Sequence, residues 1–221
     1  MDKDFFISAV PLVDIDGMTN IPTALYYEKS NKPILGHKIL NEVEKKVDIN
    51  QDFKIDLGNI DPKSPTGKKK FNTASGEKKS AIQLTSDFFY KVHDNIIEWF
   101  NKNGIERSKN LLISEPLSLQ SDMAPKDWLS QYRKNLKVIL SGEKYGFENI
   151  DFLPEPFAVF QYYRYGLKHP VLYQQSKQNA LVIDFGGGTF DVCVIETTKE
   201  GDVRKGGKSS KPLPKLSGSV L

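Results

Sequence analysis

A glycine-rich loop at residues 184–191 carries the residue types best suited to chemistry in this chain. It has the sequence Asp-Phe-Gly-Gly-Gly-Thr-Phe-Asp and lies between two apolar segments. Because glycine adopts positive φ angles without strain, Gly186, Gly187 and Gly188 can direct several backbone N–H groups at one point. Such a set of donors binds anions, and Thr189 adds a hydroxyl donor. The loop therefore predicts binding of a phosphate group.

Two carboxylates bound this loop and extend the prediction to a metal ion. Asp184 ends the first apolar segment, and Asp191 lies at the start of the second. Mg²⁺ is held in proteins by one or two carboxylates together with water and phosphate oxygens, so both aspartates are predicted to hold it through water. The alternative is a hairpin turn with ordinary turn aspartates, in which glycine only relieves strain. Three glycines are more than a tight hairpin needs, which favours the phosphate site.

The elements that position this loop follow an alternation of strand and helix patterns, because the apolar residues switch between a period of two and a period of 3.6. The sequence therefore predicts an α/β fold. Short strands are expected at residues 21–27, 34–36, 111–113, 152–153, 180–184 and 190–196. A short helix is expected to begin at Pro156 and to end near Tyr165, before Gly166.

Two longer amphipathic helices are predicted to form much of the core. The first is expected to be capped by Ser86 and to end before Gly104, and the second to run from Pro125 to Gly142. Both apolar stripes, with their tryptophans, are assigned to the core. They comprise Phe88, Phe89, Val92, Ile96, Trp99 and Phe100, then Trp128, Leu129, Tyr132, Leu136, Ile139 and Leu140.

Composition excludes several other classes of protein. The 221 residues include 38% hydrophobic and 27% charged residues, which is typical of a globular protein. The net charge of +3 is small, so no nucleic-acid partner is predicted. No apolar run approaches the roughly 18 residues of a membrane span, so no membrane partner is predicted either. The single Cys193 and the lack of an apolar leader after Met1 predict a reducing, cytoplasmic location.

Several segments together resemble the actin-like ATPase superfamily, most closely the heat-shock protein 70 (DnaK-type) chaperones. The loop 184–191 is similar to the second phosphate motif of that family, and residues 152–166 resemble its "NEPTAAAxAYG" helix. Phe53-Lys54-Ile55-Asp56-Leu57-Gly58 is similar to "FKRxxG", and residues 21–36 resemble the early strand pair. With the strand and helix that begin at Leu111, these segments occur in the family's order across about residues 18–196.

The resemblance implies a fold, a set of cofactors and a set of site residues. Residues 1–196 would form the first, ribonuclease-H-like lobe of a nucleotide-binding domain, with a mixed sheet and flanking helices. Within it, 37–80 would be a small inserted subdomain and 179–196 the start of an incomplete second lobe; 197–221, rich in Lys, Gly, Ser and Pro, is expected to be a flexible tail. ATP or ADP and Mg²⁺ are the implied cofactors.

The same resemblance assigns roles to single residues. Lys54 would reach the γ-phosphate and the attacking water, Glu155 would lie near magnesium, and both join Asp184 as catalytic candidates. A surface lysine and an ordinary helix N-terminal carboxylate are the alternatives for the first two. Co-chaperones and client proteins are the implied macromolecular partners, through domains beyond those in this sequence.

Two departures from the family limit the expected activity. Nothing before Ile21 matches its first phosphate loop, "DxGTTxS", although residues 14–19 include aspartates and a glycine. The second lobe that would hold adenosine is also lacking, so we expect this chain, as a fragment of the family's pattern, to hydrolyse ATP poorly or not at all. The alternatives are a non-catalytic interaction module on the same fold and, less favoured, a relative of the sugar kinases.

Overall fold

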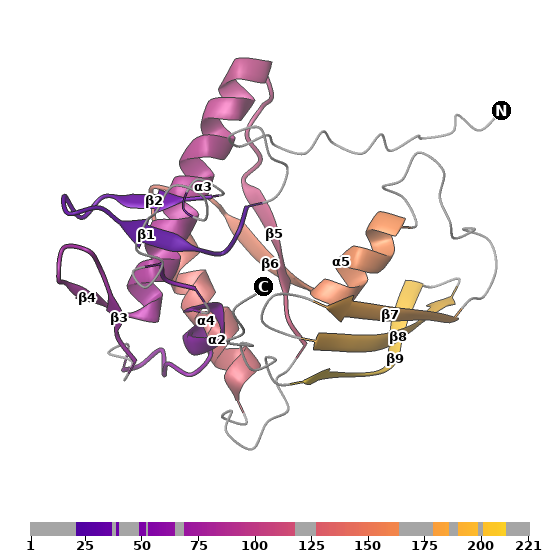
Figure 1. The fold of residues 1–221 in the computed structure, drawn as a ribbon. Coiled ribbons are helices and arrows are strands. Elements are labelled where there is room, and N and C mark those ends of the chain that lie inside the picture. Colours follow the sequence, from indigo (N-terminus) through magenta and orange to yellow (C-terminus); the bar gives the residue numbers. More distant parts are fainter. Residues whose placement is uncertain are drawn as a thin grey trace, which may run out of the picture. The chain divides into compact units, whose positions relative to one another are not determined.

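The computed structural model describes residues 21–36, 39, 49–51, 53–64, 69–117, 127–163, 179–185, 190–198 and 201–210. These residues form helices and small sheets, which confirms the predicted α/β class (Figure 1). The chain divides into two compact units. Unit 1 comprises Met1–Val10, Ile113–Ala124 and Phe152–Leu221, and unit 2 comprises Pro11–Leu112 and Pro125–Asp151. Among the described helices, none has the length and apolar character needed to cross a membrane.

Among its described residues, unit 2 contains two short hairpins and the three helices α2, α3 and α4. Strands β1 (Leu25–Tyr27) and β2 (Pro33–Leu35) pair antiparallel, as do β3 (Phe71–Asn72) and β4 (Lys78–Lys79). The helices are α2 (Phe53–Leu57), α3 (Ala81–Asn103) and α4 (Trp128–Leu140). Strands β1 and β2 thus overlap the predicted 21–27 and 34–36, and α3 overlaps the first predicted long helix.

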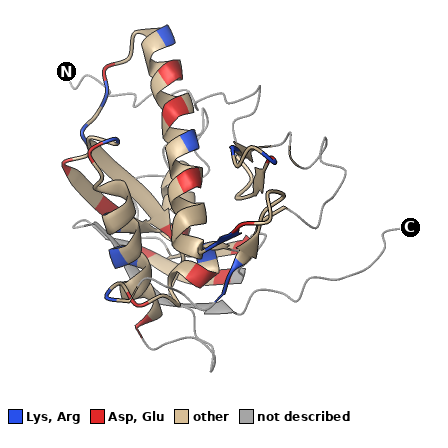
Figure 2. Cartoon of the chain, turned by 90° about the vertical axis from the view of Figure 1, so that its left-hand side faces the viewer, with Lys and Arg blue, Asp and Glu red and all other residues tan. Residues whose placement is uncertain are grey.

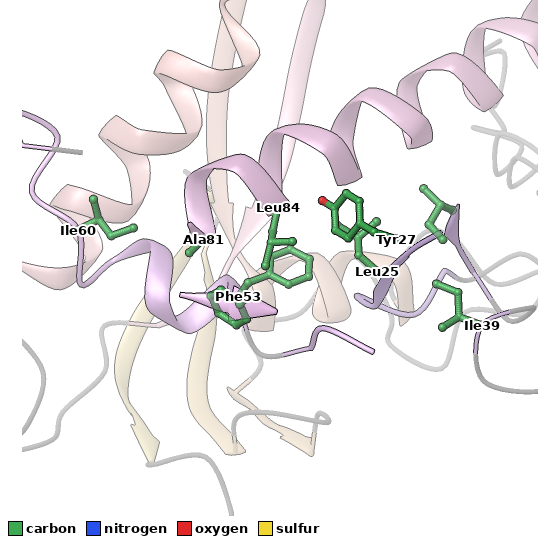
Figure 3. Packing of buried hydrophobic residues seen from close by; sticks show 9 residues of the cluster. Leu25, Tyr27, Ile39, Phe53, Ile60, Ala81 and Leu84 are labelled. Carbon is green, nitrogen blue, oxygen red and sulfur yellow. The ribbon is translucent and has the colours of Figure 1, made fainter. Parts of the chain in front are cut away.

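A hydrophobic core joins these elements of unit 2. Figure 3 shows side chains from β1, from α2 and from the start of α3 packed together, with the rings of Tyr27 and Phe53 among them. Tyr27 is fully buried, and its hydroxyl donates a hydrogen bond to Asp87 at 2.7 Å, which ties β1 to α3. The cluster comprises Leu25, Tyr27, Leu35, Ile39, Phe53, Ile60, Phe71, Ala81 and Leu84. Residues 37–80, predicted as an inserted subdomain, therefore contribute to the core of unit 2.

Helix α3 begins six residues earlier than the sequence interpretation places it. Ser80, not Ser86, is the N-cap: its hydroxyl accepts a hydrogen bond from the backbone N–H of Gln83 at 3.3 Å. The Gln83 side chain in turn accepts from the backbone N–H of Ser80 at 2.9 Å. This reciprocal capping box satisfies two N–H groups at once, which a cap at Ser86 would not do. The predicted C-terminal stop is confirmed, because Gly104 adopts a left-handed φ of 66°.

Removing the hydroxyl of Ser80 is expected to destabilise the protein. Ser80→Ala should lower the free energy of unfolding by about 1 kcal/mol, because the helix loses its side-chain cap. The matched control is Ser86→Ala inside α3, which should be neutral, since alanine is the better helix former there. Urea unfolding followed by circular dichroism measures both. Equal losses in the two variants would contradict the capping box.

The second half of α3 differs from the prediction that its whole apolar stripe is buried. Only Ala81, Leu84 and Thr85 are buried on this helix, and Trp99 is half-buried. A helix of 23 residues extends about 35 Å, which is longer than the strands of two or three residues and the short α2 beside it. Charged side chains are spaced along α3 (Figure 2), in the sequence order Asp87, Lys91, Asp94, Glu98 and Lys102.

Side chains of α4 donate hydrogen bonds to carbonyl groups at and just after the C-terminal end of α2. Asn135 donates two hydrogen bonds, to the carbonyl oxygens of Leu57 at 2.8 Å and Ile60 at 2.9 Å. The indole Nε1 of Trp128 donates to the carbonyl oxygen of Ile55 at 3.0 Å. These side chains supply partners to carbonyls at a helix end that have none within the helix. Trp128 is 1% exposed, so its predicted place in the core is confirmed.

The bounds of α4 differ slightly from those predicted. The helix begins at Trp128 after Asp127 and ends at Leu140, with Ser141 as its C-cap. Pro125, the predicted start, lies outside the described residues. The predicted stripe is buried except for Leu129, which is half-buried.

Strands β5 (Asn110–Glu115) and β6 (Asn149–Pro154) form a two-stranded sheet. The boundary between the segments of unit 2 and unit 1 falls inside both strands, after Leu112 and after Asp151. Unit 1 further contains α5 (Glu155–Gln161), β7 (Asn179–Phe185), β8 (Phe190–Thr198) and β9 (Gly201–Ser210). The last three strands form an antiparallel sheet in the order β7-β8-β9. Helix α5 overlaps the predicted 156–165 and is followed by π-helical residues 162–163, and the predicted end near Tyr165 and Gly166 lies outside the described residues.

Strand β9 corrects the prediction that the chain is a flexible tail from Thr197 onward. Residues 201–210 pair with β8 over its full length, with a register shift at Val194 and Ile195. Strand pairing uses backbone groups, so the free edge of β8 can hold a segment whose glycines and lysines disfavour strands on their own. Residues 211–221 lie outside the described residues.

Candidate functional site

The antiparallel register of β7 and β8 brings the two predicted metal ligands together. The Cα atom of Asp184 pairs directly with that of Asp191, and Val182 pairs with Cys193 two positions further along. Because successive side chains alternate between the faces of a strand, the two aspartates share a face with Val182 and Cys193. The apolar alternation of both strands therefore fixes the position of the carboxylates.

Helix α5 and Leu117, which follows β5, cover the apolar part of that face. The buried cluster comprises Leu117, Phe160, Val182, Cys193 and Ile195, with Phe157, Val159 and Ala180 packed against it. Cys193, the single cysteine of the chain, is buried in this cluster. The aspartates thus lie at one end of a well-packed sheet face, next to the loop that joins β7 to β8.

Asp191 is the most unusual group of unit 1. It is 0% exposed, and among the described residues neither of its carboxylate oxygens has a hydrogen-bond partner. A buried charge without partners costs several kcal/mol. The half-buried Asp184 lies directly opposite on the neighbouring strand, and its like charge destabilises the pair further. This end of the sheet therefore favours a cation or a set of hydrogen-bond donors.

The loop that would supply such donors is not among the described residues. Gly186, Gly187, Gly188 and Thr189 all lie outside them, so the phosphate-binding backbone stays a prediction. The structure describes the two strand ends from which this loop starts and to which it returns.

The remaining predicted site residues fall in different units. Glu155 is the first residue of α5, a helix that packs against β7 and β8 in unit 1, and it is half-buried. Its carboxylate therefore belongs to the same unit as Asp184 and Asp191, at a helix end that favours negative charge. Lys54 is half-buried on α2 in unit 2. The roles of Glu155 and Lys54 stay predictions.

The sequence interpretation missed a second buried carboxylate. Glu115, at the end of β5, is 0% exposed and belongs to unit 1. The signal is present in the sequence, since the period-two alternation places Glu115 on the same strand face as Leu111 and Ile113, which the structure half-buries. Glu196 on β8 is also buried.

The donor set fits Mg²⁺ better than metals that need a complete protein cage. Within the described ranges, no three or more His, Cys, Asp or Glu side chains gather closely enough to hold a metal ion. The strands offer two carboxylates, Asp184 and Asp191, one of them lacking partners among these residues. Mg²⁺ keeps several waters and uses one or two carboxylates with substrate phosphates. The orphaned Asp191 carboxylate is thus consistent with the predicted magnesium site.

Comparison with protein-family models finds no family whose model matches this chain. Comparison with curated proteins finds no significant match.

Proposed function

We propose that this chain is the nucleotide-binding part of a heat-shock protein 70-like chaperone, and that it binds the phosphates of ATP or ADP with Mg²⁺ at the 184–191 loop. The observation that carries the proposal is the fully buried Asp191 carboxylate, directly opposite Asp184, with no hydrogen-bond partner among the described residues. Such a group destabilises the empty protein and gains most from a bound cation.

The proposal includes an actin-like, ribonuclease-H-like fold for the described elements. Its support is the order in which the family-like segments occur, together with the antiparallel hairpin of β7 and β8 on either side of the loop. A helix, α5, precedes this hairpin and packs on it, and it begins at the glutamate of the family-like segment.

In this proposal each residue has a distinct task. Asp184 and Asp191 orient the water ligands of Mg²⁺, which neutralises phosphate charge when bound. The backbone N–H groups of residues 186–188 and the hydroxyl of Thr189 hold phosphate oxygens. Glu155 would lie near the metal, as the resemblance implies, and the resemblance assigns the terminal phosphate to Lys54, which belongs to unit 2. Within a longer chaperone, this part would act together with co-chaperones and client proteins.

Titration with ATP and Mg²⁺, followed by backbone amide NMR, tests the phosphate site. We expect selective shifts of amides in 184–191, with a dissociation constant in the millimolar range, about −4 kcal/mol. Gly187→Val should abolish these shifts, because a β-branched side chain disfavours positive φ and fills the phosphate's place. Adenosine alone is the matched ligand control and should leave the loop unchanged. Equal shifts in both proteins would make the loop an ordinary turn.

A non-catalytic interaction module is the second candidate function. The observation that favours it is the other face of β7, where Leu181 is 63% exposed and Ile183 is 58% exposed. Exposed apolar side chains gathered on one face often contact another protein. Absence of any nucleotide-dependent shift near 184–191 would leave this candidate in place of the first.

A further inference from the structure

A histidine at the centre of an aromatic cluster in unit 2 belongs to no part of the proposed nucleotide site. The ring of His93, on α3, meets the rings of Tyr145 and Phe147 edge-on, with centroid distances of 5.2 and 5.8 Å and an interplanar angle of 81° in both cases. Tyr145 and Phe147 are stacked on each other. Both belong to residues 142–148, the connection between α4 and β6, which we call the latch.

The latch contacts α3 through the aromatic rings and through Lys144, whose ammonium lies over the Tyr90 ring of α3. Tyr145 is fully buried, and its hydroxyl donates a hydrogen bond to the carbonyl oxygen of Ser86 on α3 at 3.3 Å. Within the latch, the Tyr145 N–H donates to the Gly142 carbonyl at 2.9 Å. At the end of the latch, the Glu148 N–H donates to the carbonyl of Lys109 at 2.8 Å, and the Glu148 carboxylate forms an ion pair with the Lys109 ammonium. The ring contacts of His93 act together with these interactions in holding the latch closed.

One nitrogen of His93 is left without a partner in this arrangement. Its Nε2 is buried, and among the described residues nothing forms a hydrogen bond with it. A neutral imidazole leaves only one weak acceptor unsatisfied there. A protonated imidazole would instead place an N–H donor and a positive charge at the same buried position, which costs far more free energy.

The cationic groups around His93 also disfavour its protonation. Arg107 lies over the ring of Phe147 at 5.7 Å, and the Lys144 ammonium lies 4.9 Å from the Tyr145 ring centroid and 4.6 Å from that of Tyr90. Burial lowers the pKa of His93, and the charges of Arg107 and Lys144 lower it further. Asp94 on α3 and a hydrogen bond to the backbone of Tyr145 oppose this shift in the pKa without reversing it.

We propose that residues 142–148 form an acid-sensitive latch, which is closed on α3 while His93 is neutral and is released when His93 is protonated. In the open state, water satisfies Nε2 and screens Arg107 and Lys144 from the imidazolium. The proton therefore binds the open state more tightly and shifts the equilibrium toward it. Because the latch connects α4 to β6, its release would free the ends of both elements.

The direction of the pH effect follows from linkage. The pKa of His93 in the closed state lies below the ordinary histidine value of 6.5, which we take for the open state. The closed latch is therefore fully stable above about pH 6.5, and it loses stability as the pH falls from there to the closed-state pKa. Below that closed-state pKa, the loss is constant.

Hydrogen exchange of the amides in 142–148, measured on the full chain at pH 7.5 and pH 5.0, tests the latch. After correction for intrinsic exchange, we expect the opening constant to be larger at pH 5.0, by up to about tenfold for each unit that separates the open-state and closed-state pKa values. His93→Phe keeps a ring between Tyr145 and Phe147 but cannot titrate, so its opening constant should be equal at the two pH values. A double variant, His37→Gln with His169→Gln, is the matched control and should keep the response.

A second variant keeps the proposal open to refutation if His93→Phe does not fold. Arg107→Gln removes one cation and raises the closed-state pKa of His93 toward 6.5, so the pH response of the latch should shrink. NMR titration of the His93 ring protons gives the closed-state pKa directly. An opening constant that does not change with pH in the wild type, or an equal pH response in His93→Phe, would overturn the latch.

Discussion

Replacing Asp191 by asparagine is expected to stabilise the ligand-free protein by about 2 kcal/mol. The wild-type carboxylate is fully buried and lacks hydrogen-bond partners among the described residues, and it faces Asp184 across the sheet. Asparagine removes a charge that costs about 3–5 kcal/mol when unpaired, and it leaves a neutral amide whose burial costs about 1–3 kcal/mol. Urea unfolding in the absence of nucleotide and metal measures the difference.

The same substitution should remove the stabilisation that ligand provides. For a site with a dissociation constant near 1 mM, ATP and Mg²⁺ at about 10 mM stabilise the wild type by about 1.4 kcal/mol, and Asp191→Asn should lose this gain. Asp184→Asn is the matched control: because Asp184 is only half-buried, its stability without ligand should change less. A less stable Asp191→Asn protein would show that the carboxylate has partners in the folded state, against the proposal.

The second large effect is expected at Gly58, beside the indole of Trp128. A Cβ atom at this position would lie 2.3 to 2.6 Å from three atoms of the Trp128 ring system. That ring is buried, stacks on Tyr132 and donates a hydrogen bond to Ile55, so it has no free space to move into. Gly58→Ala should therefore destabilise the protein by about 3 kcal/mol through overpacking and loss of this hydrogen bond.

Gly142→Ala is the matched control for Gly58→Ala. A Cβ atom at Gly142 would have no neighbour closer than 3.5 Å, so alanine should change the stability by less than about 1 kcal/mol. Chemical denaturation followed by tryptophan fluorescence compares the two variants. In a double-mutant cycle, Gly58→Ala combined with Trp128→Leu should destabilise less than the sum of the single changes. Strict additivity would show that the two side chains do not clash.

The sequence predicted those parts of the molecule in which local signals and packing agree. The stripe of α4 and the alternation of β7 and β8 carry the period of their element in apolar residues, so both the element and its buried face could be predicted. Gly104 ends α3 as expected because few other residues adopt the left-handed conformation easily. The pairing of Asp184 with Asp191 follows from these same strands.

The failures occur where a local signal has a competitor or where tertiary contacts decide. Ser80 and Ser86 are both suitable caps, and only the reciprocal bond with Gln83 favours Ser80. Strand β9 forms by pairing with the edge of β8. Its glycine-rich and lysine-rich sequence carries no strand pattern from which this pairing could be predicted. The pattern of β5 places Glu115 on the half-buried face of that strand, but its complete burial depends on tertiary contacts at the end of β5.

The interleaving of the two units determines how the protein can be divided. Unit 2 takes up residues on both sides of a segment that belongs to unit 1, and α4 hydrogen-bonds to carbonyls of residues 55–60 that lie more than seventy positions earlier. A fragment that stops at residue 112 would lack those donors and expose the buried face of α2. Deletion mapping would therefore assign to the second half of the chain effects that arise from unfolding of the first. An activity is better localised by single substitutions on the intact polypeptide.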